Sequence, residues 1–176
     1  DALPISVTTP ARTALDLGCW YETDEAVAAI DALLAAADLK VTEAELLAER
    51  KPGRRGIRGA RRALGLADGG SQSPKETWLR LLLIRAGFPR PQTQIPICDE
   101  LGEEFAYLDM GWEDVKVAAE YDGEQHRTDT RRYRWDVRRQ EKIQSRGWLN
   151  IRVVAGEQPR EIIRRVEAAW ARRMSR

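Results

Sequence analysis

A glycine- and serine-rich stretch, Gly69-Gly70-Ser71-Gln72-Ser73, divides the sequence into two parts with different apolar patterns. Before this stretch, apolar residues recur at helical spacing, as in Val27, Ile30 and Leu34. Runs of glycine and serine between patterned segments favour a linker. We therefore expect a domain boundary here, with a small helical domain and a basic linker over residues 1–70 and a second domain over residues 71–176.

The second part alternates between helical and strand patterns. The sequence predicts a helix, three strands, a long charged helix, a fourth strand and a closing helix, near residues 74–86, 93–98, 105–109, 115–122, 129–146, 148–154 and 159–174. This order predicts an α/β (α+β) fold in which helices flank a mixed sheet, preceded by the small helical domain.

Composition narrows the class of protein. Hydrophobic residues make up 43% of the chain and charged residues 32%, which is ordinary for a globular protein. No apolar run approaches the roughly 20 residues that span a bilayer, and no charged leader opens the chain. We expect a cytoplasmic protein with no membrane partner. Cys19 and Cys98 lack metal-ligand spacing and His126 is the single histidine, so any metal would be bound through oxygen.

Acidic and basic residues are segregated along the second part. Ten acids and only Lys116 lie between Asp99 and Glu124, whereas residues 127–146 hold eight bases and three acids. Carboxylates that concentrate a cation beside arginines that neutralise phosphates suit a polyanionic substrate. Charge runs are also typical of solvated helix faces, which is the simpler interpretation.

The predicted strand 115–122 carries the main candidate site. Alternation along a strand directs Glu120 and Asp122 to the same side, and a short hairpin brings Asp109 from the preceding strand beside them. Clustered carboxylates repel one another unless a cation such as Mg²⁺ or Mn²⁺ neutralises them. The alternative is a solvated hairpin end with scattered acids.

Two further candidates flank this cluster. Glu76 belongs to a capping box, Ser73-Pro74-Lys75-Glu76, which explains the glutamate without function, although it shares a helical stripe with apolar residues that face the sheet. His126 follows the predicted strand, and its near-neutral pKa suits proton transfer, although a lone surface histidine is usually incidental.

The charged helix is the candidate DNA-contacting element. Its bases recur along one side, which would suit a phosphate track together with one base just before the helix. The predicted contacts are Arg127, Arg131, Arg134, Arg138 and Lys142. The apolar residues Tyr133, Val137 and Ile143 are expected to face the core.

Several motifs in order resemble the very-short-patch-repair (Vsr)-like branch of the PD-(D/E)XK nuclease superfamily. They cover residues 73–176 and read Ser73-Pro-Lys-Glu-Thr, Tyr107-Leu-Asp-Met-Gly-Trp, Val117-Ala-Ala-Glu-Tyr-Asp-Gly-Glu-Gln-His, Asp136-Val-Arg-Arg and Arg146-Gly-Trp-Leu-Asn-Ile-Arg-Val. The resemblance implies a restriction-endonuclease-like core and a Mg²⁺-dependent endonuclease acting on DNA. It also implies Asp109 as the main metal ligand, Glu76 as an acid on the first helix, and residues near Asp122 and His126 as the rest of the site.

One position departs from the superfamily pattern. A lysine is expected two residues after Glu120, where this chain has Asp122. The alternative function is therefore a catalytically inactive nuclease fold that serves as a DNA-binding regulator or an antitoxin-like protein.

Residues 1–66, with Val7-Thr-Thr-Pro-Ala-Arg-Thr-Ala-Leu-Asp-Leu, resemble the C-terminal part of AbiEi-type antitoxins. The two resemblances together imply a role in bacterial defence or DNA repair, and proteins similar in both parts often carry an upstream winged-helix domain.

Overall fold

The computed structural model describes residues 6–37, 39–123 and 130–175, and in residues 130–133 it describes the backbone alone. The chain forms two compact units, Asp1–Trp78 and Leu79–Arg176. The expected boundary after residue 70 falls inside the first of these units.

The first unit is built from helices. Their bounds are α1 Pro10–Trp20, α2 Thr23–Ala36, α3 Val41–Glu49 and α4 Ile57–Leu66. Thr9 caps α1 by accepting a hydrogen bond from the Arg12 amide at 3.3 Å, and proline occupies the first helical position. At Gly18 a Cβ would lie only 2.7 Å from the Ala60 Cα, so the glycine lets α1 and α4 pack closely.

The glycine- and serine-rich stretch is attached to this unit. Asp31 of α2 is buried, and its carboxylate accepts hydrogen bonds from the Asp68 amide at 2.6 Å and from the Thr77 hydroxyl at 2.8 Å. Ser71, inside the stretch, is also buried. The predicted linker is therefore held at both ends by one buried carboxylate.

The remaining elements follow the predicted order. They are α5 Pro74–Arg85, β1 Gln92–Cys98, β2 Glu104–Trp112, β3 Val117–Asp122, α6 Thr130–Ser145, β4 Leu149–Val154 and α7 Pro159–Met174. The strands form one sheet in the order β1-β2-β3-β4, antiparallel except for the parallel pair β3 and β4. The predicted α+β fold, a mixed sheet flanked by helices, is confirmed.

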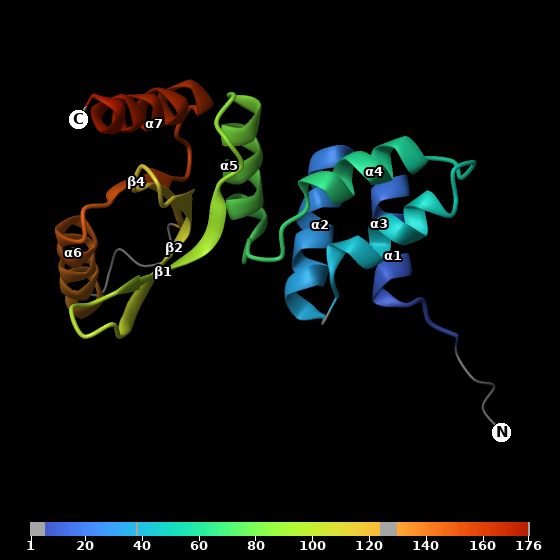
Figure 1. Ribbon diagram of the computed structural model, residues 1–176, viewed down its shortest axis with the longest axis horizontal. Coiled ribbons are helices and arrows are strands. Elements are labelled where there is room, and N and C mark those ends of the chain that lie inside the picture. The colour runs from blue at the N-terminus through green and yellow to red at the C-terminus, as the bar shows by residue number, and fades with distance from the viewer. Residues whose placement is uncertain (1–5, 38, 124–129, 176) are drawn as a thin grey trace. The chain divides into compact units, whose positions relative to one another are not determined.

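Helices α6 and α7 pack on opposite sides of this sheet. Trp170 of α7 contacts Trp112 of β2 edge-on, with ring centroids 4.9 Å apart, and Trp112 pairs with Val117 of β3. Glu120 contacts α6 through Arg139. Since Val117 and Glu120 are three residues apart on one strand, their side chains point to opposite sides. Figure 1 shows both helices beside the strands.

A buried apolar cluster holds α6 against β1, β2 and β3 of the sheet. It contains Ile95, Ile97, Ala106, Leu108, Ala118, Ile143 and Trp148.

In the described part of the chain, no helix combines the length and the apolar character needed to cross a membrane.

We expect Gly111→Ala to lower the free energy of unfolding by about 2 kcal/mol, as overpacking of a close contact does. A Cβ at Gly111 would lie 2.6 Å from the Val117 carbonyl oxygen, so β2 and β3 would have to move apart. Urea denaturation followed by circular dichroism measures the change. Gly123→Ala is the control, because no atom of the residues that the structure describes lies within 4 Å of its Cβ position. Equal losses in the two variants would contradict the prediction.

Candidate functional site

Asp109 lies where the regular pairing of β2 and β3 ends. The last paired residues toward this end are Met110 and Ala119. Beyond them, the Asp109 carboxylate accepts a hydrogen bond from the Tyr121 amide at 2.9 Å, which brings it alongside the strand segment that carries Glu120 and Asp122. The side chain of Asp109 takes the place of a backbone acceptor here, and Asp109 is only partly buried.

Glu120 is the buried centre of a hydrogen-bonded network. Its carboxylate pairs with the Arg139 guanidinium at 2.6 Å and accepts a hydrogen bond from the side-chain amide of Gln140 at 3.2 Å. The Asn150 side chain of β4 donates a hydrogen bond to the same carboxylate, and it also donates to the side-chain oxygen Oε1 of Gln140 at 3.2 Å. Both Glu120 oxygens therefore already accept hydrogen bonds, from α6 and from β4.

Asp122 belongs to a second, more exposed network. Arg152 of β4 bridges Asp122 at 2.6 Å and Asp136 of α6 at 2.5 Å. Burial acts to lower the pKa of Arg152, but its hydrogen bond to Asp136 and the charges of Asp122, Asp136 and Glu120 outweigh this, so the pKa of Arg152 is raised. The arginine remains charged and holds the two carboxylates near each other.

The predicted metal ligands differ in how accessible they are. The side chain of Glu120 is 9% exposed, whereas that of Asp122 is 39% exposed. Among the described residues, no three histidine, cysteine, aspartate or glutamate side chains form a group that could hold a metal ion. Mg²⁺ is commonly bound by only one or two carboxylates, with waters and substrate phosphates completing its shell. Asp109 and Asp122 are less buried than Glu120, and their role as metal ligands stays a prediction.

Glu76 caps α5. Its carboxylate accepts hydrogen bonds from the Gln72 amide and from the Ser73 hydroxyl, each at 2.8 Å, and its own amide donates to the Ser73 hydroxyl at 3.2 Å. These contacts account for the glutamate as a capping residue. A role for Glu76 in catalysis stays a prediction.

The remaining predicted site residues are His126, predicted for proton transfer, and the predicted DNA contacts. His126 and Arg127 lie outside the described residues, as does the side chain of Arg131. Arg134, Arg138 and Lys142 are exposed on α6, and the Lys142 ammonium lies 5.5 Å from the centre of the Phe105 ring.

Helix α6 faces the sheet with a stripe of residues that differs from the expected one. Ile143 is buried as predicted, but Val137 is 39% exposed, so its assignment to the core side is wrong. The side chains that contact the sheet network are Asp136, Arg139 and Gln140, which recur with Ile143 at a spacing of three and four residues. Arg134 and Arg138 consequently project from the opposite side of the helix.

Sequence reasoning missed five residues of these networks: Asp136, Arg139, Gln140, Asn150 and Arg152. The helical spacing from Ile143 back to Asp136 could have identified the first three. The parallel register, which pairs Glu120 with Arg152, has no comparable signal in a single sequence.

Comparison with known proteins gives relatives but no activity. The chain is 34% identical over 154 residues to two uncharacterized proteins of Mycobacterium tuberculosis, MT2308 of strain CDC 1551 / Oshkosh and Rv2248 of strain ATCC 25618 / H37Rv. The match covers 88% of this chain and 56% of each relative, so the chain spans about half the length of the curated relatives it matches. No protein-family model and no solved structure matches it.

Arg139→Ala should lower the free energy of unfolding by about 3 kcal/mol, because it leaves the buried Glu120 carboxylate without its ionic partner. Arg138→Ala is the matched control, since this adjacent arginine is exposed and should change stability by no more than about 0.5 kcal/mol. Urea denaturation of both variants measures the difference. Similar values for the two arginines would show that the Glu120 pair contributes little.

Proposed function

We propose that this protein is a metal-dependent endonuclease that hydrolyses phosphodiester bonds of DNA. The observation that carries the proposal is the hydrogen bond from the Tyr121 amide to Asp109, because it brings Asp109 beside the end of the strand that holds Asp122. The motif resemblance of residues 73–176 to Vsr-like nucleases points to the same reaction. A role in bacterial DNA repair or in defence against foreign DNA is part of this proposal.

Asp109 and Asp122 are the proposed ligands of Mg²⁺ or Mn²⁺. A bound ion of this kind polarises a phosphodiester and lowers the pKa of a water. Arg152 positions Asp122 through their ion pair, and Glu120 fixes α6 and β4 around the site through Arg139 and Asn150. Glu120 therefore has a positioning role in this proposal. His126 remains the candidate for proton transfer.

The exposed side of α6 is the proposed DNA contact. Arg134 and Arg138 lie one helical turn apart on the side that faces away from Glu120, so they are free to approach phosphates beyond the reacting one. Arginine contacts to phosphate give affinity and register without reading sequence. The proposed contact of α6 with the DNA is therefore made through the phosphate backbone.

Cleavage of supercoiled and linear DNA in the presence of Mg²⁺ or Mn²⁺ tests the proposal. Asp109→Ala should lower the cleavage rate at least about 100-fold, since even residues that only support a metal ligand commonly cost 10- to 100-fold. Asp114→Ala is the control, because Asp114 is an exposed acid in the turn between β2 and β3 and should leave the rate within about twofold. Undiminished cleavage by the Asp109 variant, or no cleavage by the unchanged protein with either metal, would refute the proposal.

A second function is favoured by one specific observation. Glu120 and Asp122 are each paired with an arginine, an arrangement that is also stable without a metal. We propose as the alternative a nuclease fold that binds DNA without cleaving it, as a regulator or an antitoxin-like protein. Salt-sensitive DNA binding without metal-dependent cleavage would support this alternative.

Both functions predict the same dependence of DNA affinity on salt. Replacing Arg134 and Arg138 together by glutamine should reduce the slope of log affinity against log salt concentration by about 2, because each phosphate contact contributes about 0.9. Fluorescence anisotropy with a labelled duplex over a range of salt concentrations measures the slope. Arg160→Gln, which removes one exposed charge from α7, should leave it unchanged. If the double substitution leaves the slope unchanged, α6 is not part of the DNA interface.

A further inference from the structure

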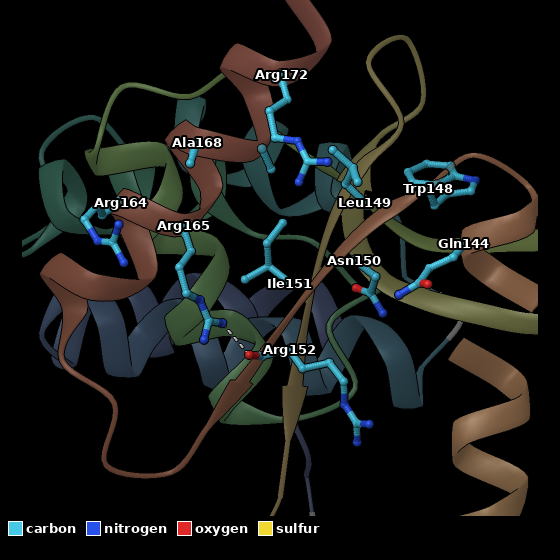
Figure 2. A pocket seen from close by; sticks show the side chains of 11 residues that line it. Gln144, Trp148, Leu149, Asn150, Ile151, Arg152, Arg164, Arg165, Ala168 and Arg172 are labelled. Carbon is cyan, nitrogen blue, oxygen red and sulfur yellow. Dashed lines mark hydrogen bonds between the residues drawn. The ribbon is translucent and has the colours of Figure 1, made fainter. Parts of the chain in front are cut away.

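A pocket of about 460 Å³ lies along the free edge of β4, against α7. Its basic residues are Arg152, Arg164, Arg165 and Arg172. Its apolar residues include Leu149, Ile151, Ala168 and Ala169. Figure 2 shows the arginines of α7 and Ile151 of β4 around the same space. The volume is within the range of sites for small organic ligands, roughly 300 to 1,000 Å³.

The pocket follows the edge of the sheet more than either of its faces. Consecutive residues of β4 line it, including Leu149, Asn150 and Ile151, although their side chains alternate between the two faces. On α7, Arg164, Ala168 and Arg172 recur every four residues and so lie on one side of the helix. The small Ala168 leaves a recess between the two arginines, with apolar side chains of β4 at its floor.

Two contacts argue against an added β-strand as the occupant. Arg165 donates a hydrogen bond to the Arg152 carbonyl oxygen, and the Glu157 carboxylate accepts one from the Val154 amide at 3.1 Å. These backbone groups are the ones that an incoming strand would need for pairing. Arg165 is further fixed by an ion pair with Glu157 at 3.1 Å. From Arg152 to Val154, the edge of β4 is therefore blocked for a pairing strand. The recess suits a ligand smaller than a peptide strand.

The arginines differ in their freedom to bind an anion. Arg152 and Arg165 each pair with carboxylates of the protein. Arg164 pairs with Glu161 on the helix surface, and its side chain is 68% exposed, so it can exchange this partner at little cost. Arg172 is exposed and forms no ion pair with any residue that the structure describes. Arg172 is accordingly the principal anion-binding group of the pocket.

We propose that this pocket binds a phosphorylated nucleoside, with the phosphate held by Arg172 and the base lying on Ala168 and Ile151. A guanidinium binds phosphate through paired hydrogen bonds and also stacks on aromatic rings, so Arg164 at the other end of the recess suits the base. An apolar floor with arginines at its ends matches a flat ring joined to an anion. The site uses none of the proposed metal ligands, so it goes beyond the proposed cleavage reaction and does not require it.

Isothermal titration calorimetry of the full chain with AMP, adenosine and inorganic phosphate tests the proposal. AMP should bind at least about tenfold more tightly than either part alone, because the pocket contacts both the base and the phosphate. Arg172→Gln should weaken AMP binding about tenfold through loss of a charge-assisted hydrogen bond. Ala168→Leu should abolish AMP binding by filling the recess while it leaves every charge in place.

Control variants test whether AMP binds in this pocket rather than through general positive charge or at the carboxylate site. Arg160→Gln, on the same helix but outside the pocket, and Asp109→Ala should each leave AMP affinity within about twofold. AMP that binds no better than phosphate, an Arg160 variant that loses as much as the Arg172 variant, or an acidic peptide that outcompetes AMP would each overturn the proposal. Competition by a six-nucleotide single strand with a 5′-phosphate, but not by the same strand without it, would support the proposal and identify a strand end as the source of the nucleotide.

Discussion

The carboxylate of Glu120 on β3 connects this strand to helix α6 and to strand β4. Among the described side chains of α6, only Ile143 is buried, so apolar burial contributes little to the docking of this helix. The polar contacts of Glu120 with Arg139 and Gln140 therefore stabilise the packing of α6 on the sheet. Asn150 extends this network to β4. Parallel pairing of β3 with β4 requires a crossover, and α6 is that crossover. The pairing that positions Arg152 therefore depends on one buried carboxylate.

The same network determines where the charges of α6 point. Because Asp136, Arg139 and Gln140 face the sheet, the arginines that alternate with them face away from it. The arginines of α6 therefore fall into two sets, one that faces the sheet and one that faces away from it. Arg139 neutralises an internal carboxylate, while Arg134 and Arg138 stay exposed. Burial of Glu120 is tolerable only because the arginine and two amides satisfy its oxygens.

The sequence predicted those features that local patterns encode. Apolar periodicity gave the order of helices and strands in the second unit, and the spacing from Ser73 to Glu76 gave the cap of α5, which the structure confirms. The expected hairpin does bring Asp109 of β2 to the Tyr121 amide of β3, while its role as a metal ligand stays a prediction.

The contacts that the sequence did not predict depend on pairing between distant segments. Arg138 and Arg139 are adjacent and chemically identical, and only the rotational phase of α6 decides which one meets Glu120. The expected core side was right for Ile143 and wrong for Val137, which is apolar but exposed, whereas the polar Gln140 contacts the sheet network. Arg152 meets Asp122 only through the register of a parallel pair, and a single sequence carries no signal for that register.

The hydrogen bonds that Asp31 accepts from Asp68 and Thr77 affect how this chain can be divided into parts. A fragment cut at the glycines, where composition invites a boundary, would lose Thr77 from a carboxylate that is almost fully buried. An isolated helical fragment would then lose one hydrogen bond to this carboxylate, which destabilises it. The residues up to Thr77 therefore belong to the folding unit of the helices, and a fragment for separate expression has to include them.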